Sequence, residues 1–106
     1  MLSSYFGAGS IVTQNTSPSF ADAVSQSVLL LVESGKAQLS YVDEVLESLK
    51  ALGPYFVIAP GLALAHAKPS TSVLAPGMAL LTLHAPVISG SANDPVSLIF
   101  SMFSPN

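Results

Sequence analysis

Two short apolar runs lie back to back in the segment 53–70, which reads GPYFVIAPGLALAHAKPS. The first run (55–59) is aromatic and β-branched and is bounded by a Gly-Pro and a Pro-Gly pair, which is typical of a short buried strand. In the second run, Leu62, Leu64 and His66 alternate with alanines, so an extended backbone places the imidazole on the face of the two leucines. The pattern predicts two strands joined by a turn, with a histidine near the end of the second.

His66 is the candidate for reactive chemistry in this segment. Its small neighbours leave the ring open to a partner, and a neutral imidazole attacks through one ring nitrogen while a hydrogen bond holds the other. Lys68 could lie beside a phosphate carried on that ring. Three hydroxyls further on could donate to the same phosphate, those of Ser70, Thr71 and Ser72. A lone histidine next to a leucine face is more often structural, so these residues alone leave both interpretations open.

The composition predicts a surface that is poor in charge. Of the 106 residues, 50% are apolar and only 8% are charged, whereas an average soluble domain is about 25% charged. A chain of this length forms one domain with a single core. Either something else covers much of the surface, or the chain is a piece of a larger unit whose other part covers it. We favour the second explanation.

Several classes of protein are disfavoured. The net charge is −3 and the only cations are three lysines, so no basic patch is available for nucleic acid. The chain has no cysteine, which removes disulfides, thiolate metal sites and a cysteine nucleophile. The segment 1–12 lacks the basic region of a signal peptide, and no apolar run reaches membrane-spanning length. We expect a soluble cytoplasmic protein with no direct membrane insertion.

Apolar residues at helical spacing predict two helices. The first follows Ser19 and Asp22, which resemble a capping box, and Gly35 supplies its stop. The second follows Ser40 and Asp43, which repeat the capping pattern, and it ends at a Gly-Pro pair. The first helix is amphipathic, with one face expected in the core.

Further strands are predicted on both sides of these segments. Residues 10–13 are the candidate for a first strand in a weakly patterned N-terminal region. Residues 78–83 are apolar apart from Thr82, as in a strand that is buried on both faces. Alternation in 96–103 predicts a half-buried strand. Two helices interspersed with about four strands, joined by short turns, favour an α/β layered fold.

The segment GPYFVIAPGLALAHAKP, followed by PGMALLTLHAPV and NDPV, resembles the IIA component of the bacterial sugar phosphotransferase system. The likeness runs in order from about Ser19 to the C-terminus, falls in the mannitol/fructose class and is greatest to its ascorbate-type branch. It implies a mixed β-sheet flanked by helices. It also implies that His66 is the phosphoryl-accepting histidine and that Gly61 and Ala63 are the small residues before it. Lys68 matches a position that is commonly basic in the family.

Four departures from the family pattern are visible. Ala65 stands where the family usually has proline, and Phe20 where it usually has tryptophan. Some mannitol-type relatives have an arginine near the end of the second helix that helps to bind phosphate. Residues 47–50 read ESLK here, so that role is absent or is taken by Lys68. Relatives also continue past the last strand with an assisting histidine and with helices that pack on the sheet, so we expect 1–106 to be a single, C-terminally truncated domain.

The resemblance implies a phosphocarrier. His66 would take a phosphoryl group from the histidine-containing phosphocarrier protein and pass it to a cysteine on the IIB component. This transfer would be coupled to uptake of a sugar or of ascorbate, with the membrane IIC component as an indirect partner. No cofactor is implied, and a metal is not expected, because the other histidine, His84, has no acidic or sulfur ligand at a useful local spacing. The alternative is a degenerate IIA-like module that binds a partner without carrying phosphate.

Overall fold

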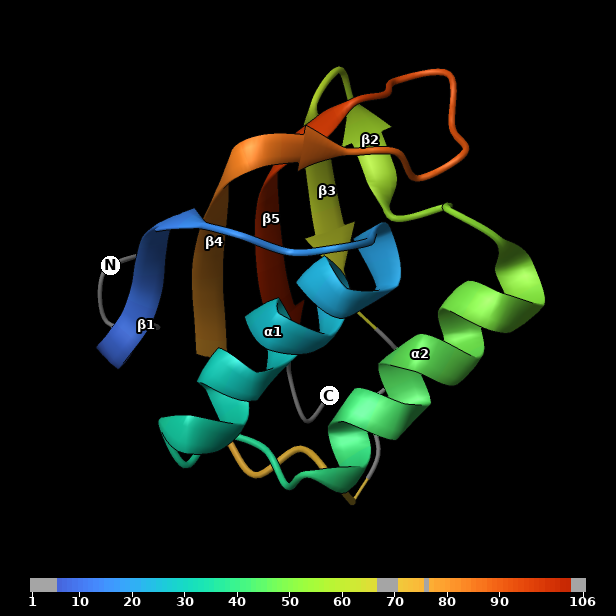
Figure 1. Ribbon diagram of the computed structural model, residues 1–106. Helices are drawn as coiled ribbons and strands as arrows, with labels where there is room; N and C mark the ends of the chain where they lie inside the picture. The colour runs from blue at the N-terminus through green and yellow to red at the C-terminus, as the bar shows by residue number, and fades with distance from the viewer. Residues whose placement is uncertain (1–5, 67–70, 76, 104–106) are drawn as a thin grey trace.

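The described residues fold into two helices and a five-stranded sheet (Figure 1). The computed structural model describes residues 6–66, 71–75 and 77–103. In chain order the elements are β1 (Phe6–Asn15), α1 (Phe20–Glu33), α2 (Ser40–Leu52), β2 (Val57–Ala59), β3 (Leu62–Ala65), β4 (Gly77–Val87) and β5 (Val96–Phe103). The predicted α/β class is confirmed.

The sheet is mixed, with the strand order β1-β4-β5-β3-β2. β1 is parallel to β4 and β3 is parallel to β5, whereas β4 with β5 and β2 with β3 are antiparallel pairs. The last strand in the sequence, β5, therefore lies in the centre of the sheet. β3 is held between β5 and the edge strand β2, which places the end of β3 at a fixed position.

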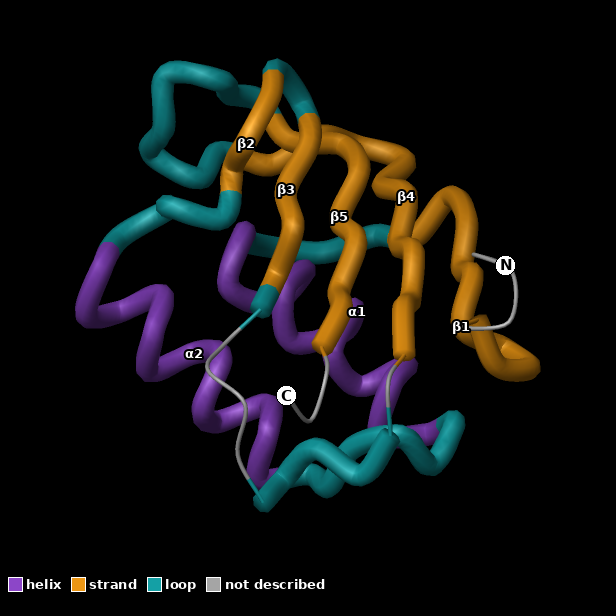
Figure 2. The backbone as a smooth tube through the Cα atoms, turned by 180° about the vertical axis from the view of Figure 1, so that it is seen from behind, coloured by secondary structure: helices purple, strands orange, loops and turns teal. Residues whose placement is uncertain are grey.

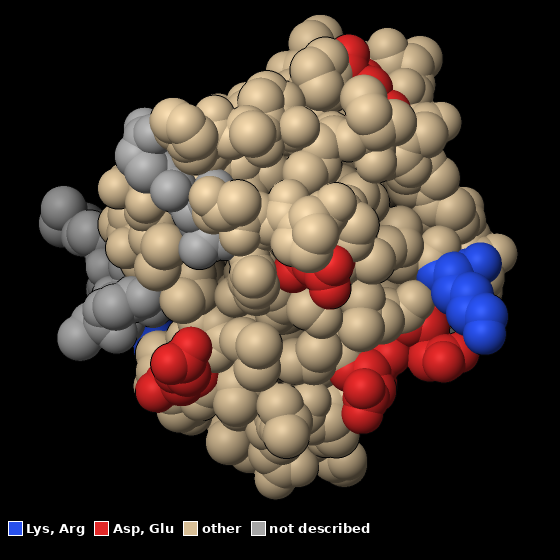
Figure 3. All heavy atoms as spheres, viewed as in Figure 1, with Lys and Arg blue, Asp and Glu red and all other residues tan. Residues whose placement is uncertain are grey.

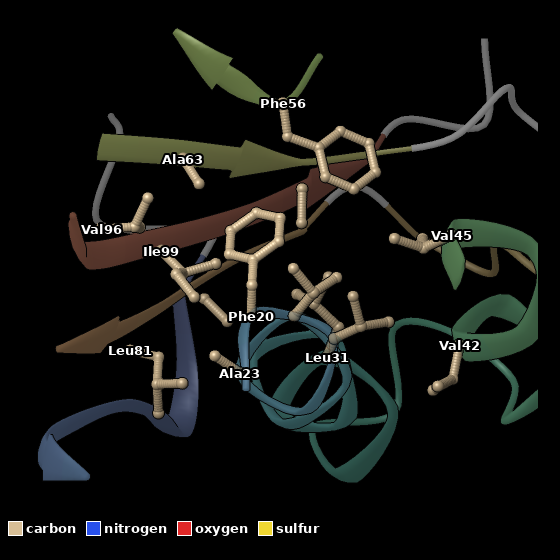
Figure 4. Close-up of a cluster of buried hydrophobic side chains, with 14 of the residues drawn as sticks. Phe20, Ala23, Leu31, Val42, Val45, Phe56, Ala63, Leu81, Val96 and Ile99 are labelled. Atoms are coloured by element: carbon tan, nitrogen blue, oxygen red, sulfur yellow. The ribbon is translucent and has the colours of Figure 1, made fainter. Parts of the chain in front are cut away.

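α1 packs across the sheet with one face buried (Figure 4). Ser19 caps this helix as predicted, because its side chain accepts a hydrogen bond from the backbone N–H of Asp22 at 3.2 Å. Small strand residues belong to the same buried cluster, namely Ala63, Ala65 and Ala79. Because alanine side chains are short, the helix can lie close to the strands. The helix contributes Phe20, Ala23, Val24, Val28 and Leu31 to this cluster.

A buried serine pair joins α1 to the central strand. Ser27 on α1 and Ser101 on β5 are both fully buried, and their hydroxyls hydrogen-bond to each other. Ser27 Oγ also donates to the backbone carbonyl of Ile99 at 3.4 Å, so Ser101 is the donor within the pair. A buried hydroxyl without a partner costs about 1–3 kcal/mol. The pair therefore places polar groups in the core without that penalty.

The start of α2 differs from the prediction. Ser40 was expected to cap the helix, but it is the first helical residue, and Leu39 at the N-cap position makes no side-chain hydrogen bond. The Ser40 hydroxyl instead hydrogen-bonds to that of Ser72, which joins the start of the helix to the segment before β4. The predicted end is correct, since Gly53 follows Leu52 with a φ of +75°.

Two strand predictions were partly wrong. The strand predicted at 78–83 continues to Val87, and it is not buried on both faces, because only alternate residues (Ala79, Leu81 and Leu83) are fully covered. The run at 55–59 forms a strand only from Val57 to Ala59, at the edge of the sheet. The predicted first strand at 10–13 is confirmed as part of the longer β1.

The second face of the sheet is apolar and open. In Figure 2 the strands lie in front of both helices, and none of the described elements covers them from this side. Four large residues on this face are 37–57% exposed: Ile11 on β1, Ile58 on β2, and Leu98 and Met102 on β5. The open face explains why β4 alternates instead of being buried throughout.

Charge is also sparse on the side that carries the helices. Figure 3 shows a few small acidic and basic patches on a mostly uncharged surface. Among the described helices, none has the length and apolar character needed to cross a bilayer. The cytoplasmic location stays a prediction.

One carboxylate organises the loop between β4 and β5. Asp94 accepts hydrogen bonds from the hydroxyl of Ser89, from the Ser89 N–H at 3.0 Å and from the Gly90 N–H at 2.7 Å. The Ser89 hydroxyl, followed by these backbone donors, lowers the pKa of Asp94 below its ordinary value. The loop in turn holds the β2–β3 turn, because the carbonyl of Asn93 accepts a hydrogen bond from the Gly61 N–H at 3.0 Å.

Gly61 ties the β2–β3 turn to the centre of the sheet. Its φ of +76° lies in the region that favours glycine. Its carbonyl accepts hydrogen bonds from the N–H groups of Ser97 at 3.0 Å and Leu98 at 3.1 Å. The start of β3 is therefore fixed to β5 on one side and to the β4–β5 loop on the other.

We expect Asp94→Asn to remove part of the acid sensitivity of the fold. Since the pKa of Asp94 is lowered from 3.8 in the folded chain, its carboxylate stabilises the fold above that value, and this contribution is lost as the pH falls through the folded-state pKa. The variant should be less stable than the parent at neutral pH, and the difference should shrink below about pH 4.

Urea unfolding midpoints measured between neutral pH and about pH 2.5 test this expectation. Asp43→Asn, which removes an exposed carboxylate from α2, controls for the change in net charge. A difference between parent and Asp94→Asn that is constant over the whole pH range would contradict it.

The open sheet face predicts that the chain binds a hydrophobic dye or self-associates. Contiguous exposed apolar surface behaves in this way. Leu98→Gln should reduce dye fluorescence more than the control Leu52→Gln, because Leu52 is 68% exposed but lies on α2, away from this face. Fluorescence titration and sedimentation measure both effects. A monomer that melts sharply and binds no dye would show that the face is not available.

Candidate functional site

His66 follows directly after the end of β3 at Ala65. The ladder between β3 and β5 extends to Ala65, so the sheet fixes the backbone that leads into the histidine. Ala63 and Ala65 are fully buried, whereas Leu62, Leu64 and His66 are partly exposed. The predicted alternation is confirmed, and the histidine is reachable from outside while its backbone is anchored in the core.

The imidazole of His66 makes a hydrogen bond through one of its two nitrogens. Nδ1 lies 2.9 Å from the backbone carbonyl oxygen of Leu64. A carbonyl oxygen can only accept, so Nδ1 carries the proton and donates it. In the neutral ring the lone pair is then on Nε2, to which none of the described residues makes a hydrogen bond. The ring is therefore held in the tautomer that presents Nε2 as a nucleophile.

Two aromatic rings border the imidazole. The ring of Tyr55 meets it edge-on, with centroids 5.3 Å apart and an interplanar angle of 78°. The ring of Phe56 lies 5.5 Å from it at 53°. Phe56 is fully buried, whereas Tyr55 is 37% exposed, so one wall belongs to the core and the other faces outward.

The hydroxyl of Tyr55 also contacts the backbone of His66. Tyr55 Oη donates to the carbonyl oxygen of His66 at 3.1 Å. Partial burial raises the pKa of Tyr55 above its ordinary value, and the nearby side chain of Ser48 acts in the opposite direction. The hydroxyl therefore stays protonated near neutral pH and remains a donor.

The structure describes only two of the other four predicted site residues. Lys68 and Ser70 lie outside the described residues. Thr71 is exposed, and the hydroxyl of Ser72 donates to the carboxylate of Glu44, so its proton is directed at α2.

His84 lies on β4 and is exposed. Within the described part of the chain, no group of three or more histidine and acidic side chains could hold a metal ion.

Tyr55 and Ser48 were missed by sequence reasoning as members of the site. Tyr55 lies in an apolar run and was interpreted as part of a strand, although β2 begins two residues later. Ser48 lies in the ESLK segment, where an arginine was sought. A tyrosine at the border of an apolar run was the available signal, because a partly buried hydroxyl needs a partner.

The chain matches a known family along almost all of its length. Residues 4–106 match the family model described as phosphoenolpyruvate-dependent sugar phosphotransferase system, EIIA 2. Over 94 residues the chain is 38% identical to the ascorbate-specific PTS system EIIA component of Shigella boydii and 37% identical to that of Escherichia coli. Each match covers 88% of this chain and 61% of the relative, so the chain spans about three fifths of the length of these curated relatives.

Solved structures share the fold. The mannitol-specific cryptic phosphotransferase enzyme IIA from Escherichia coli superimposes with a TM-score of 0.88 and 28% identity, covering 99% of this chain and 71% of that one. Mannitol enzyme IIA from Escherichia coli, solved in complex with phosphorylated enzyme IIB, gives a TM-score of 0.82 at 20% identity, over 95% of this chain and 71% of that one. At 20% identity, the second comparison shows a shared fold alone. With a family match that spans residues 4–106, the chain belongs to the EIIA 2 family of the phosphoenolpyruvate-dependent sugar phosphotransferase system.

Proposed function

We propose that the chain is a phosphocarrier and that Nε2 of His66 accepts the phosphoryl group. The observation that carries the proposal is the 2.9 Å hydrogen bond between His66 Nδ1 and the Leu64 carbonyl. It leaves the lone pair on Nε2, so the ring is a nucleophile without a separate general base. Membership of the family supports the same role for this histidine.

The transfer step balances without a cofactor. The Nε2 lone pair forms a bond to phosphorus while the phosphorus–nitrogen bond of a donor phosphohistidine breaks, and the electrons of that bond return to the donor ring. The proton stays on Nδ1 of His66, where the Leu64 carbonyl accepts its hydrogen bond. The phosphorylated ring is then cationic, which makes it a good leaving group when an acceptor thiolate attacks the phosphorus.

The donor and acceptor are part of the proposal. The donor is the histidine-containing phosphocarrier protein, and the acceptor is a cysteine of the IIB component, which serves a membrane IIC component. An enzyme IIA of the same fold has been solved in complex with phosphorylated enzyme IIB, which supports the second partner. Relatives that are 37–38% identical are ascorbate-specific, which supports ascorbate or a sugar as the transported compound.

Phosphorylation of His66 tests the proposal. With phosphoenolpyruvate and the general phosphotransferase proteins, the chain should acquire one phosphoryl group on Nε2, in a bond that is labile to acid and stable to base. His66→Ala should abolish the uptake, because among the described residues around the site no other nitrogen is prepared to attack. Mass spectrometry and ³¹P NMR give the stoichiometry and the bonded nitrogen. If the parent is folded by circular dichroism and takes up no phosphate at any donor concentration, the chain is instead a module that binds without carrying phosphate.

Two further variants test the contributions of Lys68 and His84 to phosphorylation. Lys68→Ala should slow or weaken phosphorylation by less than tenfold, because a cation beside a partly exposed phosphate contributes on the order of 1 kcal/mol. His84→Gln is the matched control and should stay within a few-fold of the parent, since His84 is exposed on β4. Initial rates of phosphoryl uptake measure both. Loss of uptake in His84→Gln with the fold intact would assign His84 a part in the reaction.

A further inference from the structure

We propose that Tyr55 is a positioning residue that fixes the His66 imidazole in the orientation in which Nδ1 bonds to Leu64 and Nε2 is left for the phosphoryl group. The inference rests on the proposed phosphocarrier function and adds a residue to it. Three contacts carry it: the hydroxyl of Tyr55 on the His66 backbone, its ring against the imidazole, and the contacts that hold Tyr55 itself.

The hydroxyl anchors the backbone of His66. β3 ends at Ala65, so the carbonyl of His66 lies beyond the strand. Tyr55 Oη donates to that carbonyl at 3.1 Å from a position eleven residues earlier, just before β2. Since β2 and β3 form an antiparallel hairpin, this bond closes the open end of the hairpin at the residue that carries the imidazole.

The ring restricts rotation of the imidazole. A histidine side chain has two rotatable torsions, and the hydrogen bond from Nδ1 to Leu64 fixes only one point of the ring. The edge-on ring of Tyr55 at 5.3 Å and the ring of Phe56 at 5.5 Å occupy two further sides. Phe56 is already held in the core, so Tyr55 is the wall whose removal gives the imidazole new room.

Tyr55 is itself held from the end of α2. Its N–H donates to the carbonyl of Gly53 at 2.8 Å, directly after the helix. The Ser48 side chain, within the helix, lies near enough to the Tyr55 hydroxyl to lower its pKa. Its ring packs against Phe56 with centroids 4.4 Å apart. The orientation of His66 is therefore linked through one side chain to the last turn of α2.

A neutral hydroxyl suits this position. A tyrosine hydroxyl is protonated near neutral pH, and partial burial raises the pKa of Tyr55 further. A protonated hydroxyl donates to the His66 carbonyl and adds no negative charge beside an incoming phosphoryl group, which an ionised side chain would repel.

The first experiment reads the orientation directly and needs no phosphate. ¹⁵N NMR of the His66 ring in the unphosphorylated chain should show the Nδ1–H tautomer in the parent. Tyr55→Phe keeps the ring and removes the hydroxyl, so it should shift the ring toward a mixture of tautomers. Tyr55→Leu removes both contacts and should shift it further. Ser34→Ala is the matched control, because it also removes a hydroxyl that bonds a backbone carbonyl, at the end of α1, and it should leave the His66 signals unchanged.

The second experiment reads the consequence for phosphorylation with phosphoramidate as the chemical donor. Nε2 forms the bond to phosphorus, the phosphorus–nitrogen bond of phosphoramidate breaks, and ammonia leaves. The parent should be phosphorylated almost only on Nε2. Tyr55→Phe should be phosphorylated about fivefold more slowly, the size expected for one lost hydrogen bond, and Tyr55→Leu should also give Nδ1-phosphohistidine, seen by ³¹P NMR.

The outcomes distinguish this inference from the proposed function. If the parent is not phosphorylated, the phosphocarrier proposal fails, and the tautomers of the unphosphorylated ring still decide the role of Tyr55. If the parent is phosphorylated on Nε2 and both Tyr55 variants match it in tautomer, rate and bonded nitrogen, the positioning role is overturned. Equal melting temperatures of the parent and Tyr55→Phe ensure that a slower rate does not reflect a less stable fold.

Discussion

The packing of α1 against short side chains in the centre of the sheet is the contact on which the rest of the structure depends. Ala63, Ala65 and Ala79 let the helix approach, and the Ser27–Ser101 pair fixes it to β5. Because the helix occupies one face, each strand has a covered side and an open side, and the residues of β3 alternate accordingly. The same contact therefore sets the backbone from which the His66 side chain projects and leaves the opposite face of the sheet without a helix among the described elements (Figure 2).

The features that could be predicted from the sequence are those encoded by neighbouring residues, such as alternating side chains in a strand or a residue that ends a helix. Alternation in 62–66 predicted that the histidine shares a face with the leucines, opposite the alanines, and the structure confirms it. Which of the two faces is buried was not predicted. Ser19 and Gly53 correctly predicted one helix start and one helix end, since caps act within a single turn. The segment around His66 also predicted the family, because its motif is long and specific.

The features that could not be predicted depend on residues far apart in the sequence. Ser40 is a residue type that commonly caps helices, but its hydroxyl hydrogen-bonds to that of Ser72, 32 residues later. The burial of β4 depends on which face of the sheet the helices cover. An apolar run in the sequence does not show whether one face or both will be covered. The grouping of Ser48, Tyr55 and His66 arises only when the end of α2 meets the β2–β3 hairpin. Lys68 lies outside the described residues, so its role stays a prediction.

The central place of β5 has a consequence for the order in which the molecule can be assembled. β3 pairs with β5 on one side and with β2 on the other, and β5 is the last strand in the sequence. While the chain is being synthesised, the segment that carries His66 has only a short edge strand as a partner until residues 96–103 have emerged. The parallel pairing of β3 with β5 closes a long loop and is therefore slow compared with hairpin formation. The histidine consequently gains its rigid backbone at a late step of folding, after the helices and the first hairpin can already have formed.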